Sequence, residues 1–102
     1  MNNNQIFIAN AFSLQMLGEM AKCNVAVERI DGITEEIKAN ATSVVGHQDT
    51  ANVLGVAFNR VSLTLNKGDI VYVTQLVGGR LPEGATTLPE GFKIVWYKVT
   101  IQ

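Results

Sequence analysis

The chain has 102 residues, of which 47% are hydrophobic and 17% charged, and its formal net charge is −1. This length and composition fit a single globular domain over residues 1–102 with a modest core. The charge excludes a general nucleic-acid coat protein, which needs a broad basic face, so duplex DNA is not an expected partner. A compact polyanionic ligand is still compatible with it, because two or three clustered arginines create a local positive pocket.

Several other classes of protein are also disfavoured. The sequence has no run of about 18 apolar residues that would predict a membrane span. The beginning, Met1–Asn4, lacks the basic region of a signal peptide, and the single Cys23 has no partner for an intrachain disulfide. The carboxylates form no metal-binding cluster, and neither a P-loop nor a GxGxxG motif is present. We therefore expect a cytoplasmic protein with no membrane partner, no metal and no cofactor.

The first half of the chain predicts two strands and two short helices. Gln5–Asn10 is apolar at consecutive positions, which indicates a strand covered on both faces near the middle of a sheet. Ser13 is a candidate N-cap for a short helix, and Asn24–Ile30 is a second strand candidate. Ile33–Ala41 is moderately helical, with Thr34 as a possible cap.

A further helix is predicted to follow Thr50 and to run to about Phe58, because apolar residues recur along one face: Val53, Leu54, Ala57 and Phe58. Arg60–Leu65 alternates between polar and apolar residues, and Asn66–Asp69 supplies turn chemistry before the apolar Ile70–Val77. These three segments predict a hairpin over residues 60–77.

The last part of the chain is a loop and a strand. Residues 78–91 hold four glycines and two prolines, and Phe92–Ile101 is a final strand, in which we expect one of Trp96 and Tyr97 to be core and the other surface or interface. The order of elements, β-α-β-α-α-β-β-loop-β, predicts an α/β (α+β) fold: a mixed sheet of about five strands with helices packed on it.

The segment Gly46–Thr50 is the first candidate site. A glycine beside a helix start lets the backbone approach a ligand, and free N–H groups there attract anions. His47 is the only histidine of the chain, and it could donate a proton to a phosphate oxygen. The plainer alternative is that His47 is a helix-start residue with a satisfied ring and that Asp49 or Thr50 caps the helix.

Three further candidates lie at the ends of predicted elements. In Gly78–Gly84, Arg80 could clamp a phosphate and Glu83 could orient a hydroxyl or the arginine, although a solvated ion pair in a loop explains both equally well. Asn59-Arg60 joins a predicted helix and strand, where a single arginine is usually surface. Asn10–Ser13 lies at a strand end, where nucleotide-binding groups often occur, but capping alone would explain Ser13.

Taken together, these segments resemble the type III anti-CRISPR ring nuclease family, which is known from archaeal viruses, bacterial phages and mobile elements. The matching pieces are IANAFSLQML, VVGHQDT, NRVSLTLNKGD and QLVGGRLPEG, which together span nearly the whole chain. G-H-Q-x-T and R-L-P-E-G carry most of the resemblance.

The resemblance implies a homodimer that binds cyclic tetra-adenylate across its two-fold axis and cuts the ring without metal, which switches off type III CRISPR signalling. The ribose 2′-hydroxyl attacks the adjacent phosphorus and gives linear di-adenylate with a 2′,3′-cyclic phosphate. His47 would be the general acid, Arg80 would contact the scissile phosphate and Glu83 would help to organise the site. The implied substrate-binding residues are Asn10, Ser13, Gln15, Gly46, Gln48, Thr50, Arg60 and Gln75.

Two other functions remain open at this point. A non-catalytic module could use the same pocket to bind the cyclic oligonucleotide as a sponge or sensor. A viral structural or interaction protein would need no nucleotide ligand. Binding and cleavage of the ring distinguish the three.

Overall fold

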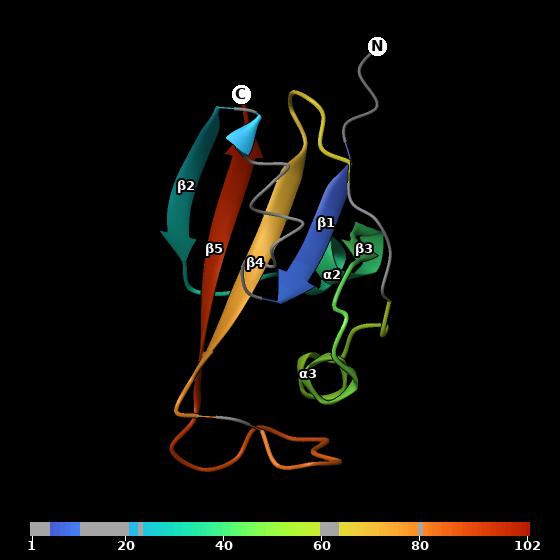
Figure 1. Ribbon diagram of the computed structural model, residues 1–102, viewed down its shortest axis with the longest axis vertical. Helices are drawn as coiled ribbons and strands as arrows, with labels where there is room; N and C mark the ends of the chain where they lie inside the picture. The colour runs from blue at the N-terminus through green and yellow to red at the C-terminus, as the bar shows by residue number, and fades with distance from the viewer. Residues whose placement is uncertain (1–4, 11–20, 23, 60–63, 80) are drawn as a thin grey trace.

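The computed structural model describes residues 5–10, 21–22, 24–59, 64–79 and 81–102 (Figure 1). Within these residues five strands form one mixed sheet in the order β2-β5-β4-β1-β3. The strands are β1 (Ile6–Asn10), β2 (Val25–Ile30), β3 (Thr42–Ser43), β4 (Ile70–Val77) and β5 (Lys93–Ile101), and the helices are α2 (Glu35–Asn40) and α3 (Gln48–Leu54). The predicted α+β class and the mixed sheet of about five strands are confirmed.

The sheet combines parallel and antiparallel pairs. β1 runs parallel to both of its neighbours, β3 and β4. β5 runs antiparallel to β4 on one side and to β2 on the other. The C-terminal ends of β1 and β4 therefore lie at the same edge of the sheet, where Asn10 is in register with Thr74.

β1 is buried on both faces, as its continuous apolar sequence predicts. Phe7 and Ala9 belong to one core cluster, together with Val71, and Ile8 belongs to a second cluster, together with Tyr72. Successive side chains of a strand point to opposite faces, so the two clusters lie on opposite sides of the sheet.

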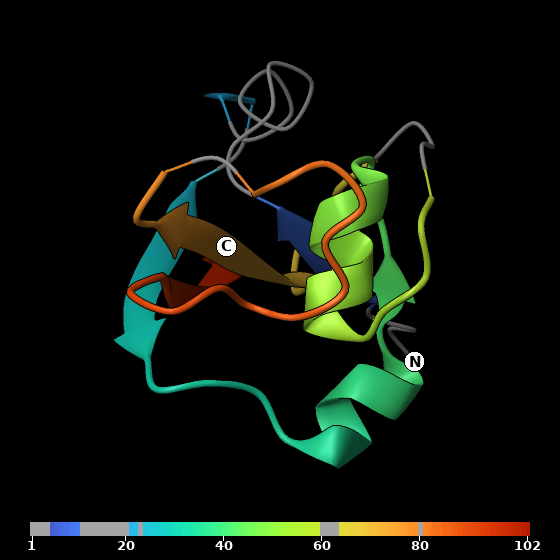
Figure 2. The same cartoon turned by 90° about the horizontal axis from the view of Figure 1, so that it is seen from below.

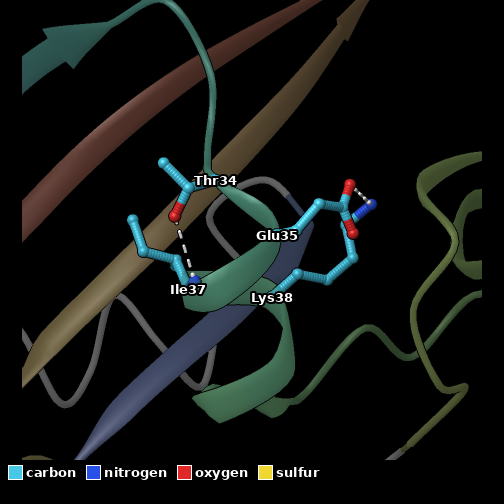
Figure 3. Close-up of polar contacts among 4 residues, drawn as sticks. All are labelled: Thr34, Glu35, Ile37 and Lys38. Atoms are coloured by element: carbon cyan, nitrogen blue, oxygen red, sulfur yellow. Dashed lines mark hydrogen bonds and ion pairs between the residues drawn. The ribbon is translucent and has the colours of Figure 1, made fainter.

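Both described helices pack on the face that carries Ile8. Ala51 and Leu54 of α3 belong to this cluster, and Ile37 of α2 packs against it. α2 begins where Thr34 caps it: the Thr34 hydroxyl oxygen accepts a hydrogen bond from the Ile37 N–H at 3.1 Å, and Lys38 pairs with Glu35 at 3.6 Å (Figure 3). The predicted helix with Thr34 as its cap is confirmed.

α3 begins at Gln48, ahead of the start predicted after Thr50, and it also ends earlier than predicted. It ends at Leu54 because Gly55 adopts a left-handed conformation (φ 70°) and donates its N–H to the Asn52 carbonyl at 3.2 Å. The chain then returns along the sheet, where Phe58 bridges in parallel to Val45. The prediction that the helix and its apolar face continue to residue 58 is therefore wrong. The helix ends at Leu54, and the Phe58 side chain is 45% exposed.

The predicted hairpin over residues 60–77 is also wrong. Both edges of β4 are already paired, with β1 and β5, and Thr64-Leu65 is not in a strand, while residues 60–63 lie outside the described residues. Leu65 is buried by packing in the core cluster that holds Phe7. The actual hairpin joins β4 to β5 through the loop of residues 78–92.

Asp69 links three segments of the sheet through hydrogen bonds. Its side chain is 1% exposed, and its two carboxylate oxygens accept hydrogen bonds from the N–H groups of Gln5 and Asn66, each at 2.9 Å. Its backbone carbonyl accepts from Ile101 at 2.9 Å. One residue therefore joins the start of β1, the turn before β4 and the end of β5.

The remaining expectations about the fold have mixed outcomes. Trp96 and Tyr97 are both half-buried and pack against opposite core clusters, so burial within one chain does not divide them into one core residue and one surface or interface residue. The helix expected after Ser13 lies outside the described residues. In the described part of the chain, no helix is long and apolar enough to cross the bilayer.

Candidate functional site

The end of β1 contacts the segment that leads into α3. The Asn10 side-chain oxygen accepts a hydrogen bond from the Gly46 N–H at 3.3 Å. Val45, which precedes Gly46, is fully buried, and its carbonyl accepts from the Asn59 N–H at 2.9 Å. Two residues expected to bind substrate, Asn10 and Gly46, are thus brought together on a firmly anchored stretch of backbone.

His47 itself is the N-cap of α3. Its backbone is extended (φ −129°), and its Nδ1 accepts a hydrogen bond from the Thr50 N–H at 3.4 Å, while the Thr50 hydroxyl lies 3.5 Å from the same nitrogen. Because Nδ1 accepts, the hydrogen of the neutral ring is on Nε2. The ring is exposed. The alternative that His47 is a helix-start residue with a satisfied ring agrees with this geometry. The cap of the helix, however, is His47 itself and not Asp49 or Thr50.

The helix start is a weaker attractant for anions than the sequence suggested. α3 has seven residues and carries the acidic Asp49 in its first turn. The Thr50 N–H is already engaged by His47. A short helix has a small dipole, and a carboxylate in the first turn offsets part of it. Positive charge for a polyanionic ligand must therefore come from side chains.

The loop between β4 and β5 reaches this helix. Pro82 to Ala85 form a β-turn, closed by a hydrogen bond of 3.1 Å from the Ala85 N–H to the Pro82 carbonyl, with Gly84 at φ 77°. The Gly84 N–H donates to Oδ1 of Asp49 at 3.2 Å. Figure 2 shows the loop running alongside α3. The turn that carries Glu83 is therefore tied by a hydrogen bond to the helix that His47 caps.

Two more described residues of the expected substrate-binding set are Gln48, in the first turn of α3, and Gln75 on β4. Gln48 uses its side-chain N–H to bond the Asn52 side-chain oxygen at 2.9 Å, which keeps it along the helix. Gln75 is exposed on β4, one residue beyond Thr74, the register partner of Asn10. Strand alternation puts Gln75 on the sheet face opposite to Asn10.

The other expected site residues, Ser13, Gln15, Arg60 and Arg80, lie outside the described residues. Asn59, just before Arg60, is held by a bond of 2.9 Å from its side-chain N–H to the Ser43 carbonyl. The residues whose placement is described contain no group of three His, Cys, Asp or Glu side chains that could hold a metal ion.

A family model described as STIV B116-like matches residues 6–99. The chain belongs to the STIV B116-like family. Among solved structures, B116 of Sulfolobus turreted icosahedral virus is similar to this STIV B116-like chain with a TM-score of 0.67 and 23% sequence identity, over 95% of this chain and 99% of that chain. At this identity the likeness supports a shared fold. No curated protein sequence matches the chain.

Proposed function

We propose that this STIV B116-like protein is a metal-independent ring nuclease, which binds cyclic tetra-adenylate and cleaves it to linear di-adenylate with a 2′,3′-cyclic phosphate. The observation that carries the proposal is the hydrogen bond from Gly84 to Asp49, which joins residues 35 positions apart. It unites G-H-Q-x-T and R-L-P-E-G, the two pieces on which the resemblance to anti-CRISPR ring nucleases mainly rests.

His47 has the chemistry of the proton donor that this reaction needs. The 2′-oxygen of the substrate attacks phosphorus, the bond from phosphorus to the 5′-oxygen breaks, and the protonated ring gives its Nε2 proton to the departing oxygen. The proton of the 2′-hydroxyl passes to solvent. Protonation of Nδ1 gives up the hydrogen bond from the Thr50 N–H, and the Thr50 hydroxyl, 3.5 Å from Nδ1, can then accept a hydrogen bond from the protonated ring.

The substrate supplies its own nucleophile, so the protein mainly has to hold the ring in position for attack. In the proposal, Arg80 contacts the scissile phosphate and Glu83 helps to organise that site. Asn10 and Gly46 lie beside His47 in the proposed site, and the hydrogen bond of 3.3 Å from the Gly46 N–H to the Asn10 side chain holds the backbone that leads to His47.

The proposal includes a homodimer. Two-fold symmetry in a ring of four nucleotides matches an isologous pair of subunits. Pairing would double Arg60 and Arg80, so that a chain with a net charge of −1 offers a basic cavity to four phosphates. Cleavage of this messenger would switch off type III CRISPR signalling in the cytoplasm of the cell.

The test is to incubate the purified protein and its His47→Ala variant with radiolabelled cyclic tetra-adenylate in EDTA. We expect the wild-type protein to produce linear di-adenylate with a 2′,3′-cyclic phosphate, and the variant to be slower by about 100-fold or more. Binding without cleavage by the wild-type protein would contradict the enzyme and favour a sponge or sensor. Absence of binding would contradict any function of this site towards cyclic oligoadenylates and leave a structural or interaction protein.

A further inference from the structure

Asp49 is the unexpected member of the candidate site. It lies in the first turn of α3, two residues after His47, and is half-buried. A carboxylate at this point repels a substrate that carries several phosphates. Its presence beside a site for a polyanion therefore calls for a role other than contact with the substrate.

A hydrogen-bond acceptor at position 49 can hold the loop between β4 and β5 against α3. Residues 78–92 form a long connection, and the hydrogen bonds of Ala85 to Pro82 and of Phe92 to Pro89 stay within it. The bond from Gly84 to Asp49 instead ties the loop to α3. It acts on the turn that carries Glu83, so a change at Asp49 would reach Glu83 through the backbone of the loop.

The left-handed conformation of Gly84 is part of this arrangement. At φ 77°, in the turn from Pro82 to Ala85, Gly84 presents its N–H to Asp49. Open space surrounds the position that a Cβ would take at Gly84, so the glycine is needed for its backbone conformation and not for close packing. Helix and loop thus meet through one backbone donor and one side-chain acceptor.

We propose that Asp49 is a positioning residue of the ring nuclease, which holds the turn bearing Glu83 against the start of α3 and so sets the geometry between Glu83 and His47. This inference rests on the proposed function. Asp49 acts through the loop and takes no part in proton transfer. Its oxygen is needed as a hydrogen-bond acceptor, while its negative charge is a disadvantage for substrate binding.

Two variants separate the acceptor from the charge. Asp49→Asn keeps an oxygen that can accept from Gly84 and removes the charge, whereas Asp49→Ala removes both. Both variants lose the favourable interaction of the carboxylate with the helix dipole. Alanine has the higher helix propensity of the two, so a lower kcat in Asp49→Ala than in Asp49→Asn would not come from a weaker helix. Asp31→Asn, at an exposed position just after β2, is the control for loss of an acidic charge elsewhere.

The experiment measures kcat and KM for cleavage of cyclic tetra-adenylate, and the chemical shift and hydrogen exchange of the Gly84 amide, for the wild-type protein and the three variants. For Asp49→Ala we expect the Gly84 amide to exchange faster and kcat to fall about five- to tenfold, with KM not raised. For Asp49→Asn we expect kcat within about twofold of wild type and a lower KM at low salt. Asp31→Asn should match the wild type.

Three outcomes would overturn the inference. One is a released Gly84 amide in Asp49→Ala with kcat unchanged, which would mean that the anchor does not serve the reaction. Another is an Asp49→Asn variant as slow as Asp49→Ala, which would mean that the charge matters and not the acceptor. The third is an unchanged Gly84 amide in Asp49→Ala. Absence of cleavage by the wild-type protein would instead contradict the proposed function itself.

Discussion

Replacing the Asp69 carboxylate tests whether it holds the strand order. The Asp69→Asn variant keeps one oxygen for one of the two N–H donors, Gln5 and Asn66, and turns an NH₂ group towards the other. A hydrogen bond to a charged acceptor contributes about 1.5–3 kcal/mol, and the lower end applies here because both bonds are only partly buried. We expect a loss of about 1.5–2 kcal/mol for Asp69→Asn and about 3 kcal/mol for Asp69→Ala.

Urea denaturation followed by circular dichroism measures this effect. With a slope of about 1.5 kcal/mol per molar urea, the midpoint should fall by about 1 M for Asp69→Asn and about 2 M for Asp69→Ala. The exposed Asp31→Asn should stay within about 0.5 kcal/mol of wild type. If Asp69→Asn were also that close to wild type, the carboxylate would not be what holds the start of β1 to the turn before β4.

Two further predictions concern the candidate site and the loop beside it. Thr50→Val removes the hydroxyl near His47 and should slow ring cleavage about fivefold, while Thr50→Ser should retain the rate; equal rates for Thr50→Val and wild type would contradict the orienting role. Gly78→Ala should lower the free energy of unfolding by about 2 kcal/mol, because φ is 129° and a Cβ would lie 3.1 Å from Phe92. Gly32→Ala, where a Cβ meets no atom within 4 Å, is the matched control, and equal denaturation midpoints for the two variants would refute this reasoning.

The features predicted correctly from the sequence are those encoded locally. Consecutive apolar residues in β1 indicated burial on both faces, and Phe7 and Ile8 do lie in opposite core clusters. Thr34 was a candidate cap three residues before Ile37, and this spacing alone predicts the hydrogen bond that starts α2.

The errors arise where distant parts of the chain compete for the same position. The alternation that ends at Leu65 predicted a strand next to β4, but β1 and β5 occupy both edges of β4. Leu65 is nevertheless buried. The alternating pattern therefore predicted the burial of Leu65 correctly but was wrong that its segment pairs with β4. The helix predicted to reach Phe58 stops earlier because Gly55 takes the left-handed conformation, which outweighs the apolar spacing beyond it.

The candidate site also contains one contact that follows from the local sequence and one that does not. The contact between His47 and Thr50 spans three residues and is a local consequence of helix capping. The contact between Asp49 and Gly84 spans 35 residues, and no local pattern reports it. A glycine in a proline-rich loop was visible in the sequence, but the acceptor that holds it was not.

The most direct test of the ring nuclease uses His47→Asn. Asparagine is a strong N-cap and can accept from the Thr50 N–H, so the variant keeps the structural role of His47 and removes its proton donor. We predict an unfolding midpoint close to wild type, unchanged binding of cyclic tetra-adenylate, and single-turnover cleavage in EDTA slower by about 100-fold or more. Cleavage at the wild-type rate by a folded His47→Asn protein would show that His47 only caps α3, and it would contradict the account of how this protein acts on its ring substrate.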